Sequence, residues 1–168
     1  LQPKIDDKTL TVLSKQVTFE QVNTQGWIAA NAQKRMDTVL SGSYEKAELD
    51  GILSPNDTLA RAAIASVDAA NKPLPVVTGQ DSEVESVKSI MAGEQYSTIN
   101  KDTRKLVEDT IAMVVALQKG QEPTVNDTES YDNGVKIVPA NLLEPVIVTK
   151  ENAAEAYADD PTLFPLTQ

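Results

Sequence analysis

Residues 75–81 read PVVTGQD, a short apolar run that ends in a glycine turn and a carboxylate. The apolar run predicts a strand at residues 74–77, and the helical spacing of the apolar residues after the turn predicts a helix over residues 84–91. A strand that leads directly into a helix is the repeating unit of α/β folds. The stretch therefore indicates an α/β fold and raises the question of what Asp81 does at the end of its strand.

The same alternation of strand and helix extends to both sides of this stretch. The strands are expected at residues 10–13, 49–53, 74–77 and 96–99, and the helices over residues 28–40, 54–67, 84–91 and 106–117. After Gly120 the pattern changes to a polar loop with a turn at residues 132–134, two short strands at residues 135–138 and 145–148, and a short helix after Asn152. This order predicts a parallel sheet flanked by helices.

The composition disfavours several classes of function. The 168 residues include no histidine and no cysteine, so the chain has no thiol nucleophile, no disulfide and no imidazole for acid–base catalysis. The 25 acidic residues outnumber the 15 basic ones, and a net charge of −10 argues against a nucleic-acid partner. The sequence contains neither a phosphate-binding glycine loop nor a dinucleotide motif, so we expect no cofactor, no metal and no enzymatic activity.

The sequence contains no apolar run long enough to span a membrane and no signal peptide. It does not begin with methionine, and residues 1–10 read like the end of a helix. We therefore expect a fragment or a processed chain.

Four residues lie where an open α/β sheet binds its ligands, outside the carboxyl ends of the strands. Asn56, Asp81 and Lys101 each follow a different predicted strand. Trp27 lies just before the first complete helix. Such polar groups hydrogen-bond hydroxyl groups, and an indole ring stacks on the apolar face of a sugar ring. Together the four residues favour a neutral polyol over a phosphate as the ligand.

Two of these positions also fit a helix start. Ser54 can be an N-cap, with Pro55 at the first helical position and Asp57 in the capping-box place. Asp81 can likewise be an N-cap, although a capping box one residue later, made by Ser82 and Glu85, would leave Asp81 to point into the crevice.

The other two positions have equally plain interpretations. Lys101 can be a solvated surface charge, and Trp27 can be a core residue. Only the joint placement of the four residues favours a binding site over these structural roles.

Most of the chain resembles a known family. The blocks are GWIAANAQKRMDTVLSG, GILSPNDTLARAAIASV, KPLPVVTGQDSEVESVKSIMAGEQYSTINKDTRKL and SYDNGVKIVPANLLEPVIVTKEN. They resemble periplasmic sugar-binding proteins of bacterial ABC importers, of the xylose-binding and multiple-sugar-binding group, from Leu1 to about Asn152. The resemblance implies a type I periplasmic-binding-protein lobe, truncated with respect to the two-lobed family.

The resemblance also implies roles for the candidate residues. Asn56 and Asp81 match positions that hydrogen-bond sugar hydroxyls, and Trp27 resembles the aromatic residue that stacks on the sugar ring. Lys101 matches a polar ligand position at which many relatives carry Asn or Gln, which weakens its assignment.

By the same resemblance, residues 1–102 belong to the second, C-terminal lobe, and residues 103–168 are a returning segment of the first lobe with a C-terminal tail. The expected function is the capture of a monosaccharide such as xylose or glucose by lobe closure. The expected partners are a membrane permease and either the missing N-terminal lobe or a second copy of the chain. The expected location is the periplasm or the extracellular face, with a lipid anchor as one option for the full-length protein.

Two other functions remain open at this point. The first is the effector-binding domain of a sugar-responsive transcription regulator, which shares the fold. The second is a glycosidase with Asp57 and Asp81 as its acid pair, which is disfavoured because nothing in the sequence tunes either carboxylate.

Overall fold

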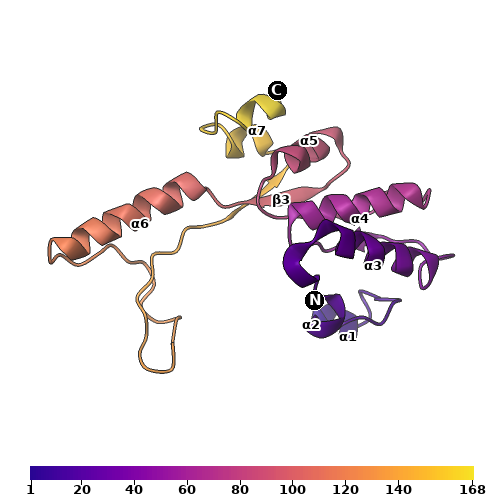
Figure 1. The fold of residues 1–168 in the computed structure, drawn as a ribbon, viewed down its shortest axis with the longest axis horizontal. Helices are drawn as coiled ribbons and strands as arrows, with labels where there is room; N and C mark the ends of the chain where they lie inside the picture. Colours follow the sequence, from indigo (N-terminus) through magenta and orange to yellow (C-terminus); the bar gives the residue numbers. More distant parts are fainter. The chain divides into compact units, whose positions relative to one another are not determined.

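A computed structural model describes residues 1–168 and divides them into two compact units. The larger unit comprises Leu1–Ile99 and Ile147–Gln168, and the smaller unit comprises Asn100–Val146 (Figure 1). None of the helices is both long and apolar enough to span a membrane.

The larger unit is built around short parallel strands. β1 (Gly51–Ile52) pairs with β2 (Val76–Val77) in parallel, with Gly51 opposite Val76. A single parallel bridge between Thr78 and Ser97 continues this order to β3 (Ser97–Asn100), which is hydrogen-bonded to β4 (Val146–Thr149). The predicted parallel arrangement is therefore confirmed, with strands shorter than the apolar runs indicate.

Helices follow or precede these strands in the predicted order. The elements of the larger unit are α1 (Gln2–Asp6), α2 (Phe19–Val22), η1 (Gln25–Trp27, a 3₁₀ helix), α3 (Ala29–Ser41), α4 (Asp57–Ala69), α5 (Val84–Ala92), α7 (Ala153–Ala156) and η2 (Phe164–Thr167, a second 3₁₀ helix). α3 packs alongside α4, and the Ser66 hydroxyl on α4 donates to the Gln33 carbonyl on α3 at 3.3 Å (Figure 1).

The C-terminal segment of the larger unit closes a small hydrophobic core. Val148 of β4, Ala153 of α7, Tyr157 and Leu163 are buried against Val87 of α5. Burial of these side chains stabilises the return of the chain to this unit, because the removal of apolar area from water is the main favourable term in folding.

Two predicted strands are wrong. Residues 10–13 form no strand, because the Leu10 amide donates to the Lys4 carbonyl and the Leu13 amide donates to the Tyr44 hydroxyl at 3.1 Å. Residues 135–138 make a single antiparallel bridge at Ile137, not a ladder.

The cause of the second error lies in the turn before it. The Asn133 carboxamide oxygen accepts from the amides of Val135 and Lys136, which takes the donors that a ladder needs. The predicted turn itself is present, since Gly134 has φ 81° and its amide donates to the Asp132 carboxylate.

The smaller unit consists mainly of one helix and a long loop. α6 (Thr103–Gln118) begins after Asp102, whose carboxylate caps it by accepting from the Arg104 amide at 3.0 Å. No residue of α6 is buried. Six of its large apolar side chains are exposed, namely Leu106, Val107, Ile111, Val114, Val115 and Leu117.

A cluster of polar contacts joins α4 to the start of α5. Arg61 of α4 donates to the Glu83 carboxylate at 2.6 Å and to the Ser86 hydroxyl at 2.7 Å, and Thr58 donates to the same carboxylate. Partial burial works to raise the pKa of Glu83, but the hydrogen bonds from Thr58 and Arg61 and the Arg61 charge hold it below the usual value.

We expect Arg61→Met to lower the free energy of unfolding by about 1 kcal/mol at neutral pH, a modest value because both side chains are about one-third exposed. Because the pKa of Glu83 is lower in the folded than in the unfolded protein, its ionised carboxylate stabilises the fold at pH values above the unfolded pKa. This stabilisation is lost as the pH falls through the folded pKa. The difference between wild type and Arg61→Met should therefore shrink below about pH 4, as measured by urea denaturation.

The matched control is Lys88→Met, which removes the more exposed ion pair between Lys88 and Glu85. It should change the free energy of unfolding by less than about 0.5 kcal/mol. An Arg61→Met difference that stays constant between neutral and acidic pH would contradict the assigned role of Glu83.

Candidate functional site

The carboxyl ends of β1 and β2 and the strand β3 open onto a groove of about 860 Å³ in the larger unit. No charged side chain is among the residues that line it, which are Phe19, Val22, Asn23, Thr24, Trp27, Leu53, Ser54, Pro55, Leu59, Thr78, Gly79, Gln80, Ser97, Ile99 and Ile147. An apolar surface with a few uncharged polar groups is typical of sites for neutral small molecules. We refer to this feature as the groove.

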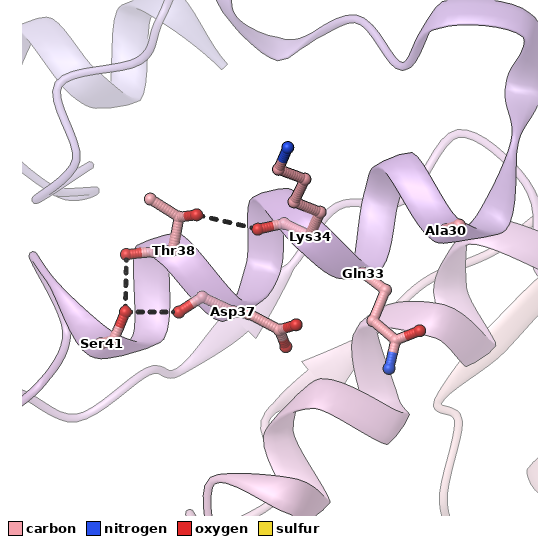
Figure 2. A pocket seen from close by; sticks show the side chains of 6 residues that line it. All are labelled: Ala30, Gln33, Lys34, Asp37, Thr38 and Ser41. Carbon is pink, nitrogen blue, oxygen red and sulfur yellow. Dashed lines mark hydrogen bonds between the residues drawn. The ribbon is translucent and has the colours of Figure 1, made fainter.

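A second hollow lies on the surface of α3 and lacks these properties. Figure 2 shows its six lining residues, Ala30, Gln33, Lys34, Asp37, Thr38 and Ser41, which all belong to that one helix. The hydroxyls of Thr38 and Ser41 donate to carbonyls of the preceding turn of α3. Because no second element contributes a group, this hollow is the surface of a single helix and not a convergent site.

One wall of the groove is the segment that contains α2 and η1, and α3 holds this segment in place. The Arg35 guanidinium donates to the carbonyls of Val22 and Asn23 and to the Thr24 hydroxyl at 3.1 Å. The Asn31 side-chain Nδ2 donates to the Gln25 carbonyl at 3.1 Å. These hydrogen bonds fix the exposed segment with its two short helices beside the strand ends.

Trp27 is at the end of this wall and is not a core residue. Its side chain is 58% exposed and lines the groove. Its φ of 55° lies in the left-handed region, which is uncommon for a residue other than glycine, and Gly26 before it has φ 68°. Phe19 lines the same wall and is 75% exposed, so two large aromatic side chains are open to solvent at the groove.

Asn56 is the N-cap of α4. Its side-chain oxygen accepts from the Leu59 amide at 3.0 Å, as expected for a residue that precedes a helix. The predicted N-cap Ser54, with Pro55 at the first helical position, is wrong because α4 begins at Asp57 and the Ser54 hydroxyl donates to the Asn56 carbonyl. Contact between Asn56 and a ligand stays a prediction.

Asp57 is fully buried and joins three parts of the larger unit. Its carboxylate accepts from Gln95 Nε2, Thr98 Oγ1 and the Glu83 amide, each at 2.9 Å. Its own amide donates to the Gln80 carbonyl at 2.9 Å. Burial raises the pKa of Asp57, whereas these hydrogen bonds favour the charged form and work against that rise.

Gly79 is required by this carboxylate. A Cβ at residue 79 would lie 2.1 Å from Asp57 Oδ1 and 2.4 Å from Gln95 Nε2. Both atoms are held by hydrogen bonds in a buried position, so neither can move away freely. The glycine of the PVVTGQD stretch therefore serves the approach of Asp57 to the end of β2.

Asp81 follows in a turn of unusual conformation. Asp81 and Ser82 have φ values of 99° and 54°, both in the region that favours glycine. The Asp81 side chain is exposed at the end of β2, and its amide donates to the Ile99 carbonyl at 3.1 Å. The predicted capping box is wrong, because α5 has Glu83 as its N-cap and no side-chain cap, and Ser82 accepts instead from Tyr157.

Three of the four predicted residues line the groove or directly follow residues that line it. Trp27 lines the groove, and Asn56 and Asp81 directly follow residues that line it, Pro55 and Gln80. Lys101 is exposed and belongs to the smaller unit, so its role stays a prediction.

Two further groove residues were not among the four predicted site residues. Phe19 is one of only two phenylalanines, and its place in a polar loop shortly before Trp27 was a usable signal. Gln80 carries the same signal as Asp81, since both follow the strand predicted at residues 74–77.

Residues 4–122 match the model of the periplasmic binding protein domain. The chain belongs to this family. It is 50% identical over 157 residues to the multiple sugar-binding periplasmic receptor ChvE of Rhizobium radiobacter, a match that covers 90% of the chain and 44% of the relative. It is 32% identical over 161 residues to the D-xylose-binding periplasmic protein of Escherichia coli, which covers 95% of the chain and 46% of that protein. The chain thus spans about half the length of these relatives.

Two solved structures of transporter solute-binding proteins share the fold closely. An ABC transporter solute-binding protein of Clostridium phytofermentans with bound β-D-glucose has a TM-score of 0.90 and 39% identity, over 100% of this chain and 53% of that one. A carbohydrate transporter solute-binding protein of Chloroflexus aurantiacus in complex with D-glucose has a TM-score of 0.82 and 33% identity, and the match covers 96% of this chain and 52% of that one. The predicted α/β lobe of a periplasmic binding protein is confirmed.

We expect Gly79→Ala to lower the free energy of unfolding by about 3 kcal/mol, because its Cβ would displace the buried Asp57 carboxylate or the Gln95 amide. Gly51→Ala is the matched control, since its Cβ would meet only the Val76 carbonyl at 3.6 Å, an ordinary contact. Chemical denaturation measures both. Equal effects of the two substitutions would show that Asp57 does not pack against residue 79 as described.

Proposed function

We propose that this chain is the C-terminal portion of the solute-binding component of a sugar ABC importer and that its groove forms one side of a monosaccharide site. The groove carries the proposal, because an exposed tryptophan and uncharged polar groups meet there at the ends of parallel strands. The names of the relatives support it, since they are sugar-binding receptors and glucose-bound transport proteins. The protein would be a receptor that binds its sugar unchanged, not an enzyme.

The chemistry of the groove suits a neutral sugar. An indole face such as that of Trp27 stacks on the C–H face of a pyranose, and the carboxamide of Gln80 can both donate to and accept from hydroxyl groups. The Asp81 carboxyl group beside it can accept hydrogen bonds from hydroxyl groups, and Asn56 is the proposed second contact at the end of β1.

The chain would contribute to both lobes of a two-lobed protein. We retain the assignment of residues 1–102 to the second lobe and the return of the chain to the first lobe after them, but we revise where the returning segment, expected over residues 103–168, ends. The compact units support one change, since Ile147–Gln168 groups with Leu1–Ile99. We therefore propose that the chain leaves the second lobe near Asn100 and rejoins it near Val146.

The smaller unit fits this organisation. The apolar side chains of α6 are exposed, and such a surface is normally covered by other protein. The missing N-terminal lobe is the occupant that we propose, with a second copy of the chain as the alternative. Lobe closure on the sugar would then form the state that the membrane permease recognises.

The periplasmic relatives support a periplasmic or extracellular location, and a lipid anchor on the full-length protein is a further option. The transcription-regulator alternative is not favoured, because the relatives named above are receptors and solute-binding proteins of transporters.

Calorimetric titration of the full-length protein with D-glucose and D-xylose tests the proposal. We expect binding of at least one sugar with a dissociation constant of about 10 μM or tighter. Trp27→Ala and Asp81→Ala should each weaken it at least about tenfold, through the loss of stacking and of a charge-assisted hydrogen bond.

Asp37→Ala is the control, because it removes an exposed carboxylate of α3 (Figure 2) that does not line the groove. Its affinity should equal that of the wild type. Failure of the wild-type protein to bind any monosaccharide would overturn the proposed function.

A further inference from the structure

We infer that two buried side chains, Asp57 and Thr98, set the affinity of the groove without touching its ligand, because they hold the turn at residues 79–82 in its strained conformation. The inference rests on the proposed function, since that turn carries Gln80 and Asp81. Both residues would be positioning residues.

Neither side chain can reach a ligand. Asp57 and Thr98 are each 0% exposed, and neither lines the groove. The Thr98 hydroxyl lies between the two groups that it connects, since it donates to Asp57 Oδ2 at 2.9 Å and accepts from the Ser82 amide at 3.1 Å. The hydroxyl therefore relays the position of a buried carboxylate to the backbone of the turn.

The turn needs such support because its backbone is strained. Asp81 and Ser82 are two successive residues other than glycine in the left-handed region, a conformation that persists only when surrounding contacts fix it. If the contacts were lost, these residues would relax to negative φ values, and the side chains of Gln80 and Asp81 would change direction. A binding site loses affinity when its groups leave their preorganised positions.

The contacts on the turn come from several elements. The Glu83 amide donates to Asp57 Oδ2 at 2.9 Å, and the Asp81 amide donates to the Ile99 carbonyl of β3 at 3.1 Å. From the C-terminal segment, the Tyr157 hydroxyl donates to the Ser82 hydroxyl at 2.8 Å. Burial raises the pKa of Tyr157, so this donor keeps its proton at neutral pH.

The choice of residue at position 98 points to the same role. Threonine and valine have nearly the same shape, so packing alone in a fully buried strand position would favour valine. Both hydrogen bonds of the Thr98 hydroxyl connect it to groups that hold the turn, Asp57 Oδ2 and the Ser82 amide. Substitution of Thr98 by valine can therefore remove the hydroxyl while the volume of the side chain stays nearly the same.

The test compares Thr98→Val, which removes the hydroxyl and keeps the shape, with Thr98→Ser, which keeps the hydroxyl. Dissociation constants for D-glucose and D-xylose are measured by calorimetry in the full-length protein, under conditions where circular dichroism shows each variant folded. Thr98→Val should weaken binding at least about tenfold, and Thr98→Ser should stay within about threefold of wild type.

Two further variants complete the comparison. Thr38→Val removes a hydroxyl that donates to the Lys34 carbonyl on the surface of α3, and it should leave the affinity unchanged (Figure 2). Tyr157→Phe removes only the hydroxyl at Ser82 and should weaken binding about threefold or more, so it provides the test if Thr98→Val does not fold.

The outcomes separate this inference from the proposed function. Wild-type protein that binds neither sugar overturns both. If the wild-type protein binds and the folded Thr98→Val and Tyr157→Phe variants bind with the wild-type affinity, the positioning role alone is overturned. The hydrogen-bond network then contributes only to the stability of the fold. Weaker binding by Thr98→Val with rescue by Thr98→Ser supports the positioning role.

Discussion

The larger unit depends on one buried carboxylate. Asp57 begins α4 and accepts hydrogen bonds from Gln95, Thr98 and the Glu83 amide, so it joins the end of β1 to the β2–α5 turn and to β3. A buried carboxylate without such partners would be costly in free energy, and without it the Thr98 hydroxyl and the Glu83 amide would lose their acceptor. The requirement for glycine at residue 79 and the strained turn at Asp81 both follow from this network.

The network explains how short strands can support a binding surface. β1 and β2 have only two residues each, so their ladder alone fixes little of the backbone beyond them. The hydrogen bonds of Asp57 extend that order past the strand ends, to the residues that line the groove. On the opposite wall, Arg35 does the same for the segment that carries Trp27, by donating to backbone carbonyls of residues 22 and 23.

The sequence predicts the alternation of elements and the strand-end location of the site, because both follow from hydrophobic periodicity and from the rule for open α/β sheets. It does not predict that Asn56 caps α4 and that Asp57 is buried, because asparagine and aspartate are both favoured N-cap residues. The strand expected at residues 135–138 fails because side chains of the adjacent turn bind the amides that a ladder uses. Long-range hydrogen bonds, such as that from Gln95 to Asp57, leave no periodic signal in the sequence.

The Asp57 carboxylate fixes the turn at residues 79–82, and native-state hydrogen exchange measures this effect most directly. Asp57→Ala in the full-length protein should speed exchange at the Ser82 and Glu83 amides at least about tenfold. The Glu83 amide loses its acceptor, and the Ser82 amide is bound to a Thr98 hydroxyl that Asp57 no longer holds. The amides in the middle of α3 should keep their protection. Unchanged protection at Ser82 and Glu83 in the folded variant would contradict the claim.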